Sequence, residues 1–253
     1  MLNPIGYRFG IPFYYDKSES DFRQDRYERY DPMVIRQSML HLADHMWGRY
    51  PMQGVVDYIR KNSSTVIAHD ILEIGCGVGR MIGDIATNNP DVQCWGIDYS
   101  YQMLKQAKEV WIDGNDVQCN PLNFGFVESI KVDSKSLTNL SLGLARGEAL
   151  PFSDMSQDLI ISSFLIDRLS DPIQCLSEMK RVLRPNGKII IVTPFNFINA
   201  TQWEQLYPLI KFQEVLKTLD FEILDWVENI LIHEPLDRRG NEILWNCIGM
   251  VLK

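Results

Sequence analysis

The sequence has no long apolar run, since no stretch approaches 18 uninterrupted apolar residues. A membrane-spanning helix is therefore not expected. The first ten residues, MLNPIGYRFG, lack the basic-then-apolar layout of a secretion signal. Cysteines are few and odd in number, and their spacing shows no metal-ligand pairs; they are Cys76, Cys94, Cys119, Cys175 and Cys247. These absences predict a cytoplasmic protein with reduced thiols and no metal site.

Basic residues are also scarce, with 25 Lys and Arg against 33 Asp and Glu and a formal net charge of −8. Binding a nucleic-acid backbone requires a basic face, and the most evident basic cluster is the pair Arg238 and Arg239. We therefore expect no nucleic-acid partner. An anionic membrane surface is disfavoured for the same reason.

Length and composition are otherwise ordinary for a soluble domain. The chain has 253 residues, of which 45% are apolar and 23% charged. One α/β domain with additions is the natural expectation for this size.

A glycine-rich stretch, ILEIGCGVGR at 71–80, stands out against this background. A short apolar run leads into Gly75, Gly77 and Gly79, and apolar residues then recur at helical spacing. Glycine lets backbone N–H groups approach a ligand closely, and the start of a helix favours an anionic group. The stretch predicts a strand, a ligand-binding turn and a helix, although a turn without a ligand would have the same pattern.

The spacing of the glycines discriminates between ligands. A dinucleotide fingerprint would require a third glycine at position 80, which is Arg80, and no Gly-Lys-Ser/Thr of a P-loop follows. The pattern is instead acidic-x-Gly-x-Gly-x-Gly, starting at Glu73, and it resembles class I S-adenosylmethionine-dependent methyltransferases. A carboxylate there repels phosphate but suits a ligand with an ammonium and a sulfonium. Cys76 is interpreted as a small residue of the turn rather than a nucleophile.

A second motif follows at the end of the next expected strand, 92–97. Asp98 lies 19 residues after Gly79, where a carboxylate can accept hydrogen bonds from both ribose hydroxyls of an adenosine. The run IDYSYQML resembles the family pattern, so Tyr99 and Met103 join Asp98 as expected cofactor-binding residues. An ordinary acidic helix start is the alternative.

Two later segments resemble the same family. In LGLARGEALPFSDMSQD, at 142–158, Gly147 and Glu148 would lie at the edge of the adenine. Arg146 departs from the family, which usually has Asp or Asn at this position as an acceptor for the adenine amine. The run RVLRPNGK, at 181–188, matches the turn that leads into a further strand.

Candidate groups near the transferable methyl come from the carboxyl ends of the strands, where ligands gather in open α/β sheets. Ser163 ends one such strand and is expected to contact the cofactor. Asp167, His233 and Glu234 are candidate general bases, needed only if the acceptor carries a proton of high pKa. His233 also has a purely structural interpretation beside the last hairpin.

The resemblance implies an α/β fold. We expect a Rossmann-like sheet of seven strands, mostly parallel with an antiparallel C-terminal strand, helices on both faces and an N-terminal helical cap. Residues 1–65 are expected to form a lid or cap, and a segment simply packed on the domain is the alternative. Tyr14 and Tyr15 are the candidates to face the cofactor. Residues 66–253 would form the methyltransferase domain, with an insertion at about 114–139.

The expected function is transfer of a methyl group from S-adenosylmethionine to O, N or C of a small-molecule acceptor. The family includes the ubiquinone/menaquinone-type methyltransferases, which keeps a quinone-like ring open as the acceptor. A non-catalytic S-adenosylmethionine-binding or scaffold protein is the alternative. The sequence predicts neither the acceptor nor the oligomeric state.

Overall fold

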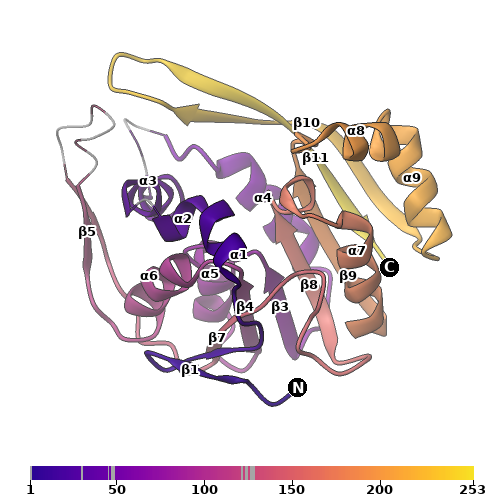
Figure 1. The fold of residues 1–253 in the computed structure, drawn as a ribbon, viewed down its shortest axis with the longest axis horizontal. Helices are drawn as coiled ribbons and strands as arrows, with labels where there is room; N and C mark the ends of the chain where they lie inside the picture. Colours follow the sequence, from indigo (N-terminus) through magenta and orange to yellow (C-terminus); the bar gives the residue numbers. More distant parts are fainter. Residues whose placement is uncertain are drawn as a thin grey trace.

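The computed structural model describes residues 2–29, 31–44, 46, 49–120, 122, 125 and 129–253. Its main sheet has the order β1-β2-β7-β4-β3-β8-β9-β11-β10 among the described residues (Figure 1). In that order the strands are Gly6–Arg8, Ile11–Phe13, Leu140–Leu144, Gln93–Asp98, Asp70–Ile74, Gln157–Ser163, Leu183–Thr193, Glu242–Leu252 and Ile223–Pro235.

Helices connect and flank these strands. They are α1 Glu19–Gln24, α2 Arg26–Arg29, α3 Asp31–Leu42, α4 Gln53–Ser63, α5 Arg80–Asn88, α6 Tyr101–Trp111, the 3-10 turn η2 Ile166–Arg168, α7 Pro172–Val182, α8 Ala200–Leu206 and α9 Leu209–Thr218. The expected insertion contains a two-stranded ribbon of β5 (Val117–Cys119) and β6 (Ile130–Val132). Within this insertion the run at 126–132 predicts a short strand, and its start falls outside the described residues.

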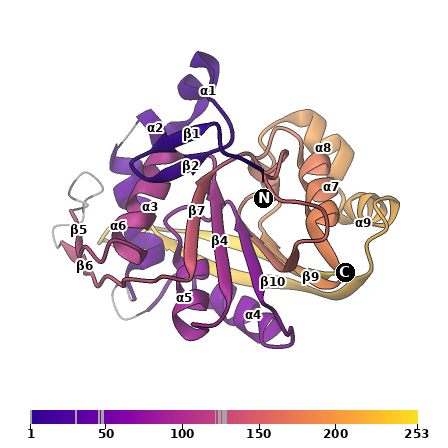
Figure 2. The same ribbon diagram turned by 90° about the horizontal axis from the view of Figure 1, so that it is seen from below.

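The central strands are buried on both faces, which explains their nearly continuous apolar sequences. In β3, Ile71 packs into the core beneath α3, α4, α5 and α6, whereas Leu72 and Ile74 face the core beneath α7, α8 and α9. Figure 2 shows these two helical layers on opposite sides of the sheet. The α/β class and the helices on both faces are confirmed.

The expectation of seven strands is wrong for the sheet as a whole. Seven strands, from β7 to β10, have the expected arrangement: β7, β4, β3, β8 and β9 are parallel, and β11 is antiparallel to its neighbours β9 and β10. The N-terminal segment adds the β1–β2 hairpin, and β2 pairs with β7 through Phe13 and Leu144. The hairpin therefore covers an edge strand that would otherwise expose unpaired backbone groups.

The two helices expected in the cap take different places. Helix α4 contacts β8, β9 and β10, so it covers one face of the sheet, whereas α3 packs against α6. Strands β10 and β11 extend beyond the sheet as a long hairpin toward α3 (Figure 1), where Arg36 pairs with Glu234 at 2.6 Å. In the described part of the chain, every helix is too short or too polar to cross a membrane.

Close packing between α5 and α6 gives a test of the fold. A Cβ atom at Gly83 would lie 2.4 Å from Cδ2 of Trp111, whose Nε1 donates to the carbonyl of Val78 at 3.0 Å. We expect Gly83→Ala to lower the free energy of unfolding by about 1 to 3 kcal/mol, because overpacking outweighs the better helix propensity of alanine. Urea denaturation measures this.

The control is Asn88→Ala, an exposed position of the same helix. A Gly83→Ala protein as stable as the wild type would contradict the packing of α6 on α5.

Candidate functional site

The glycine turn lies between β3 and α5, at the carboxyl edge of the sheet. Gly75, Gly77 and Gly79 all have positive φ, at 73°, 53° and 77°. A Cβ at Gly75 would lie 3.0 Å from Leu165 Cδ1, and one at Gly77 would lie 3.2 Å from Met103 Cε. The turn therefore requires glycine for both its backbone conformation and its close contacts.

Glu73 precedes the turn on β3 and is only 2% exposed. Its Oε2 accepts a hydrogen bond from the N–H of Ile82 in α5 at 3.0 Å. Burial raises the pKa of Glu73 to about 8, although the bond from Ile82 opposes this shift. The carboxyl group thus joins β3 to the first turn of α5.

Asp98 ends β4 directly beside the turn. Its Oδ2 accepts from the N–H of Gly77 at 2.8 Å, and its Oδ1 accepts from the N–H of Ser100 at 2.7 Å. A carboxylate has about four acceptor positions, so each oxygen keeps capacity for another donor. Burial raises the pKa of Asp98, whereas the two backbone donors lower it.

Cys76 and Met103 pack around the same turn. The Sγ of Cys76 faces β4, because a Cβ at Gly96 would lie 2.9 Å from it, and burial raises the pKa of this thiol well above its ordinary value. Only the backbone of Cys76 can serve a ligand here. Met103, at 5% exposure, supports Gly77 from α6.

Aromatic side chains from the N-terminal segment meet the loop after β4. The rings of Tyr15 and Tyr99 lie 5.9 Å apart, and the guanidinium of Arg146 lies 5.2 Å from the Tyr15 ring centroid. Tyr14 instead packs over β7, since a Cβ at Gly143 would be 3.3 Å from its ring. Tyr15, rather than Tyr14, is therefore next to Tyr99.

The loop after β7 carries the expected adenine-side residues. Gly147 packs against Cys175, whose Sγ would lie 3.0 Å from an added Cβ. Burial would raise the pKa of Glu148, but hydrogen bonds from Ser170 at 2.8 Å and Arg146 at 3.5 Å bring it below the ordinary value. Arg146 also donates to Ser170 at 3.0 Å, so this arginine connects the loop to the segment between η2 and α7 and to the aromatic pair.

Comparison with known proteins agrees with this arrangement. A family model described as a methyltransferase domain matches residues 72–191, which include the glycine turn, Asp98 and the loop after β7. Over this segment, just under half of the chain, the protein is similar to the class I S-adenosylmethionine-dependent methyltransferases.

The chain spans about half the length of the curated relatives that it matches. A ubiquinone/menaquinone biosynthesis C-methyltransferase of Geotalea uraniireducens is 29% identical over 138 residues, covering 54% of this chain and 50% of the relative. The demethylmenaquinone methyltransferase of Listeria welshimeri is 32% identical over 122 residues, covering 48% and 50%.

Solved structures share the fold of the methyltransferase over most of the chain. An S-adenosylmethionine-dependent methyltransferase from Aquifex aeolicus gives a TM-score of 0.53 at 19% identity, covering 88% of this chain and 98% of that one. The [4+2]-cyclase SpnF gives 0.59 at 15% identity, covering 89% and 93%. The fold therefore extends well beyond the matched segment.

The residues at the carboxyl edge fit S-adenosylmethionine. Asp98 is held by two backbone donors with acceptor capacity left for a ribose diol, and Gly75, Gly77 and Gly79 carry no side chains of their own. Arg80 does not offer a phosphate site, because its guanidinium pairs with Asp84 at 2.8 Å and Asp44 at 3.1 Å. When bound, the cofactor would supply both the activated methyl and the leaving group.

The carboxyl ends of β8 and β9 carry the next candidates. Ser163 is the last residue of β8, and the side chain of Leu165 just beyond it covers Gly75. Asp167 is fully buried and accepts from the N–H of Asn196 at 3.0 Å and from Thr193 Oγ1 at 3.3 Å. Burial raises the pKa of Asp167, and the nearby Arg168 opposes this. Asp167 thus joins the ends of the two strands.

The candidates on β10 face opposite ways. His233 is on the exposed side, with Nδ1 2.6 Å from Glu242 Oε1 and 38% side-chain exposure. Glu234 is on the inner side, where it accepts from Arg36 at 2.6 Å and from Trp245 Nε1 at 2.7 Å. His233 thus has a structural partner in Glu242. The pKa of Tyr27 is raised by burial first, and the charges of Asp98 and Glu234 contribute in the same direction.

Sequence reasoning missed Leu165, whose side chain covers Gly75. It also missed three charged residues of the N-terminal segment, Lys17, Asp25 and Glu28, whose local signal is the Ser18–Asp21 capping box that starts α1. Among the described residues, no three His, Cys, Asp or Glu side chains gather as a metal site.

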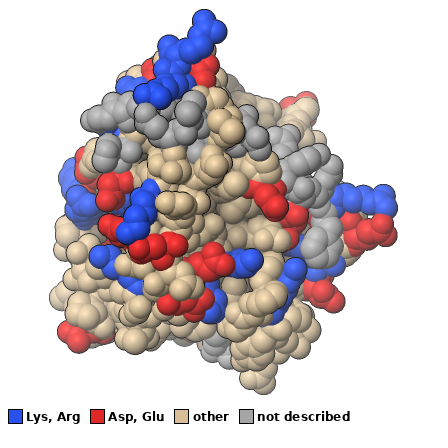
Figure 3. All heavy atoms as spheres, turned by 90° about the vertical axis from the view of Figure 1, so that its left-hand side faces the viewer, with Lys and Arg blue, Asp and Glu red and all other residues tan. Residues whose placement is uncertain are grey.

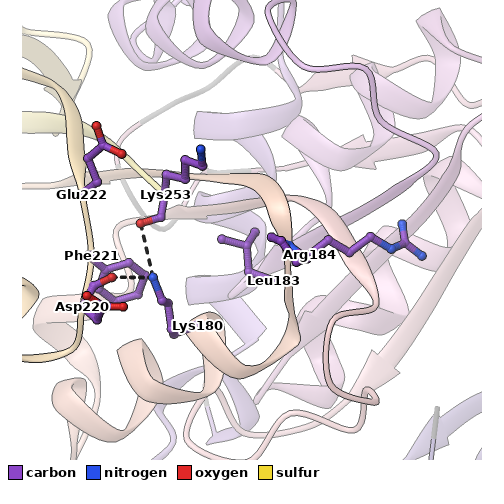
Figure 4. Close-up of a pocket in the computed structure, with 8 residues that line it drawn as sticks. Lys180, Leu183, Arg184, Asp220, Phe221, Glu222 and Lys253 are labelled. Carbon is purple, nitrogen blue, oxygen red and sulfur yellow. Dashed lines mark hydrogen bonds between the residues drawn. The ribbon is translucent and has the colours of Figure 1, made fainter.

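The surface elsewhere carries mixed charge. Figure 3 shows basic side chains lying among acidic ones on the side of the molecule it presents. A hollow of about 380 Å³ lies at the opposite end of β9, lined by residues that include Leu183, Phe221 and Lys253 (Figure 4). There Lys180 Nζ donates to the carbonyls of Asp220 at 2.5 Å and Lys253 at 3.4 Å, so it ties chain segments together.

The buried carboxyl of Glu73 predicts a pH-dependent stability of the cofactor-free protein. Because its pKa is raised in the folded state, the folded state binds the proton more tightly, and the resulting stability is lost as pH rises from about 5 to about 8. In the wild type the free energy of unfolding should decline by on the order of a few kcal/mol over this pH range, and we expect Glu73→Gln to remove that decline. Urea unfolding across this pH range measures it.

Glu214→Gln, an exposed change on α9, serves as the control and should keep the wild-type dependence. An unchanged slope in Glu73→Gln would mean that Glu73 is not protonated in the folded protein.

Proposed function

We propose that this protein transfers a methyl group from S-adenosylmethionine to a small-molecule acceptor. The observation that carries the proposal is Asp98, fixed between the glycine turn and α6 within the segment that matches the family. The relatives named as C-methyltransferases favour a ring carbon as the acceptor atom, with O and N as the other candidates. Methyl transfer is an in-line displacement, so the chain mainly has to orient and dehydrate the two reactants.

The acceptor is proposed to bind beside Tyr27, on the side of Asp98 that faces η2 and β10. Burial raises the pKa of Tyr27. The nearby charges act on the same pKa: Arg168 lowers it, and three carboxylates raise it, namely Asp98, Asp25 and Glu234. These groups come from β4, η2, the segment just before α2 and β10, which supports a place for the acceptor between the cofactor side and the long hairpin. If the acceptor must lose a proton, Glu234 is the inward-facing candidate for the base.

A second candidate function is binding of S-adenosylmethionine without methyl transfer. This candidate is supported by the similarity to SpnF, a protein named as a [4+2]-cyclase. The same fold therefore occurs in a protein named for a reaction other than methyl transfer. Binding without turnover would favour this candidate.

Cofactor binding tests the shared part of both candidates. We expect S-adenosylmethionine to bind the wild type in calorimetry and Asp98→Ala to bind roughly 10- to 100-fold more weakly, since hydrogen bonds to a charged group are lost. The control Asp91→Ala, an exposed acidic position before β4, should bind like the wild type. Absence of binding to the wild type would refute the proposal. Equal affinity of Asp98→Ala and the wild type would show that Asp98 does not bind the ribose.

Turnover separates the two candidates. Methyl-labelled S-adenosylmethionine incubated with the protein and a cell extract should yield a labelled small molecule in mass spectrometry. The Asp98→Ala protein should give far less of the same product. A cofactor that binds but never transfers its label would favour the non-catalytic candidate.

A further inference from the structure

A buried lysine connects the N-terminal arm, residues 2–29, to the cofactor side of the sheet. Lys17 Nζ pairs with Asp25 Oδ2 at 2.7 Å and with Glu28 Oε1 at 3.1 Å. The three side chains are at most 5% exposed. Because removing one partner of such a cluster leaves uncompensated buried charge, the cluster is stable only as a complete set.

The same cluster contacts the segment that follows β4. Lys17 Nζ lies 4.2 Å from the centroid of the Tyr99 ring, a cation–π contact. Glu28 Oε1, which pairs with Lys17, also accepts from the N–H of Tyr101 at 2.6 Å. Tyr99 and Tyr101 flank Ser100, whose N–H holds Oδ1 of Asp98. Figure 2 shows α1 and the β1–β2 hairpin beside β7 and β4 at this end of the sheet.

Lys17 also affects the charge balance around Asp98. Burial and the nearby Asp25 raise the pKa of Asp98, whereas Lys17 lowers it. Glu73 and Cys76 face the same carboxylate from β3 and the glycine turn, and Tyr27 faces it from α2. Lys17 is thus a cation among several groups that are neutral or negative.

We propose that Lys17 is a positioning residue of the cofactor site: it fixes the segment 99–101 and supplies the positive charge that keeps Asp98 ready to accept ribose hydroxyls. The inference rests on the proposed binding of S-adenosylmethionine. It makes the N-terminal arm part of the cofactor site through its buried charges, without direct contact between Lys17 and the cofactor.

The experiment measures the affinity for S-adenosylhomocysteine by calorimetry from neutral to acidic pH. We expect Lys17→Met to bind at least about tenfold more weakly at neutral pH, because two buried carboxylates lose their partner. Its affinity should also fall at a higher pH than in the wild type, since Asp98 would protonate more readily. Asp25→Asn keeps an acceptor oxygen but removes a negative charge. The pH at which its affinity for S-adenosylhomocysteine falls should therefore be lower than in the wild type. Lys17→Arg, which keeps the charge, should restore most of the affinity.

The control is Arg23→Met in α1, whose side chain is 74% exposed in its pair with Glu19. It removes a cation from the same arm and should bind like the wild type. The inference is overturned if the wild type binds but neither Lys17→Met nor Asp25→Asn changes the affinity or the pH at which the affinity falls. The proposed function would stand in that case. If Lys17→Met does not fold, the shift in Asp25→Asn decides alone. Failure of the wild type to bind would instead refute the proposed function.

Discussion

The carboxylate of Asp98 is the point on which the carboxyl edge of the sheet depends. One oxygen holds Gly77 in the turn after β3, and the other holds Ser100 at the start of α6. Two loops from neighbouring strands are thereby fixed by a single side chain. Because these donors are backbone groups, the arrangement depends on the backbone conformations of the turn, which only glycine adopts without strain at Gly75, Gly77 and Gly79.

The N-terminal segment packs beside the carboxyl edge of the sheet, next to β7 and the loop after β4. Hairpin β1–β2 pairs with the edge strand β7. Tyr15 and Lys17 then contact Tyr99 in the loop after β4. Farther along the chain, Arg36 of α3 pairs with Glu234 in the long β10–β11 hairpin. Residues of the same N-terminal segment therefore lie beside the loop after β4 and near the long hairpin. Two of them act on the pKa of Asp98 in opposite directions, since Asp25 raises it and Lys17 lowers it.

The parts that could be predicted from sequence are those with short-range signals. The glycine spacing, the strand before Asp98 and the apolar runs of β8 and β9 each have a local pattern, and the sheet order follows from the family that they resemble. The β1–β2 hairpin has no such pattern, since its two strands have three residues each and depend on pairing with β7. The Lys17 cluster has no such pattern either, because its partners come together only when α1 and α2 pack against each other.

Two arginines at the sequence motifs have a structural role in this fold. Arg80, where a dinucleotide site would have glycine, donates to the carbonyls of His41 and Leu42 at the end of α3, both at 3.3 Å. Arg146, where relatives usually have Asp or Asn, reaches the Tyr15 hydroxyl at 3.4 Å. Both arginines therefore join the methyltransferase sheet to the N-terminal segment. Since a long guanidinium can satisfy several acceptors at once, these positions secure the added segment without enlarging the hydrophobic core.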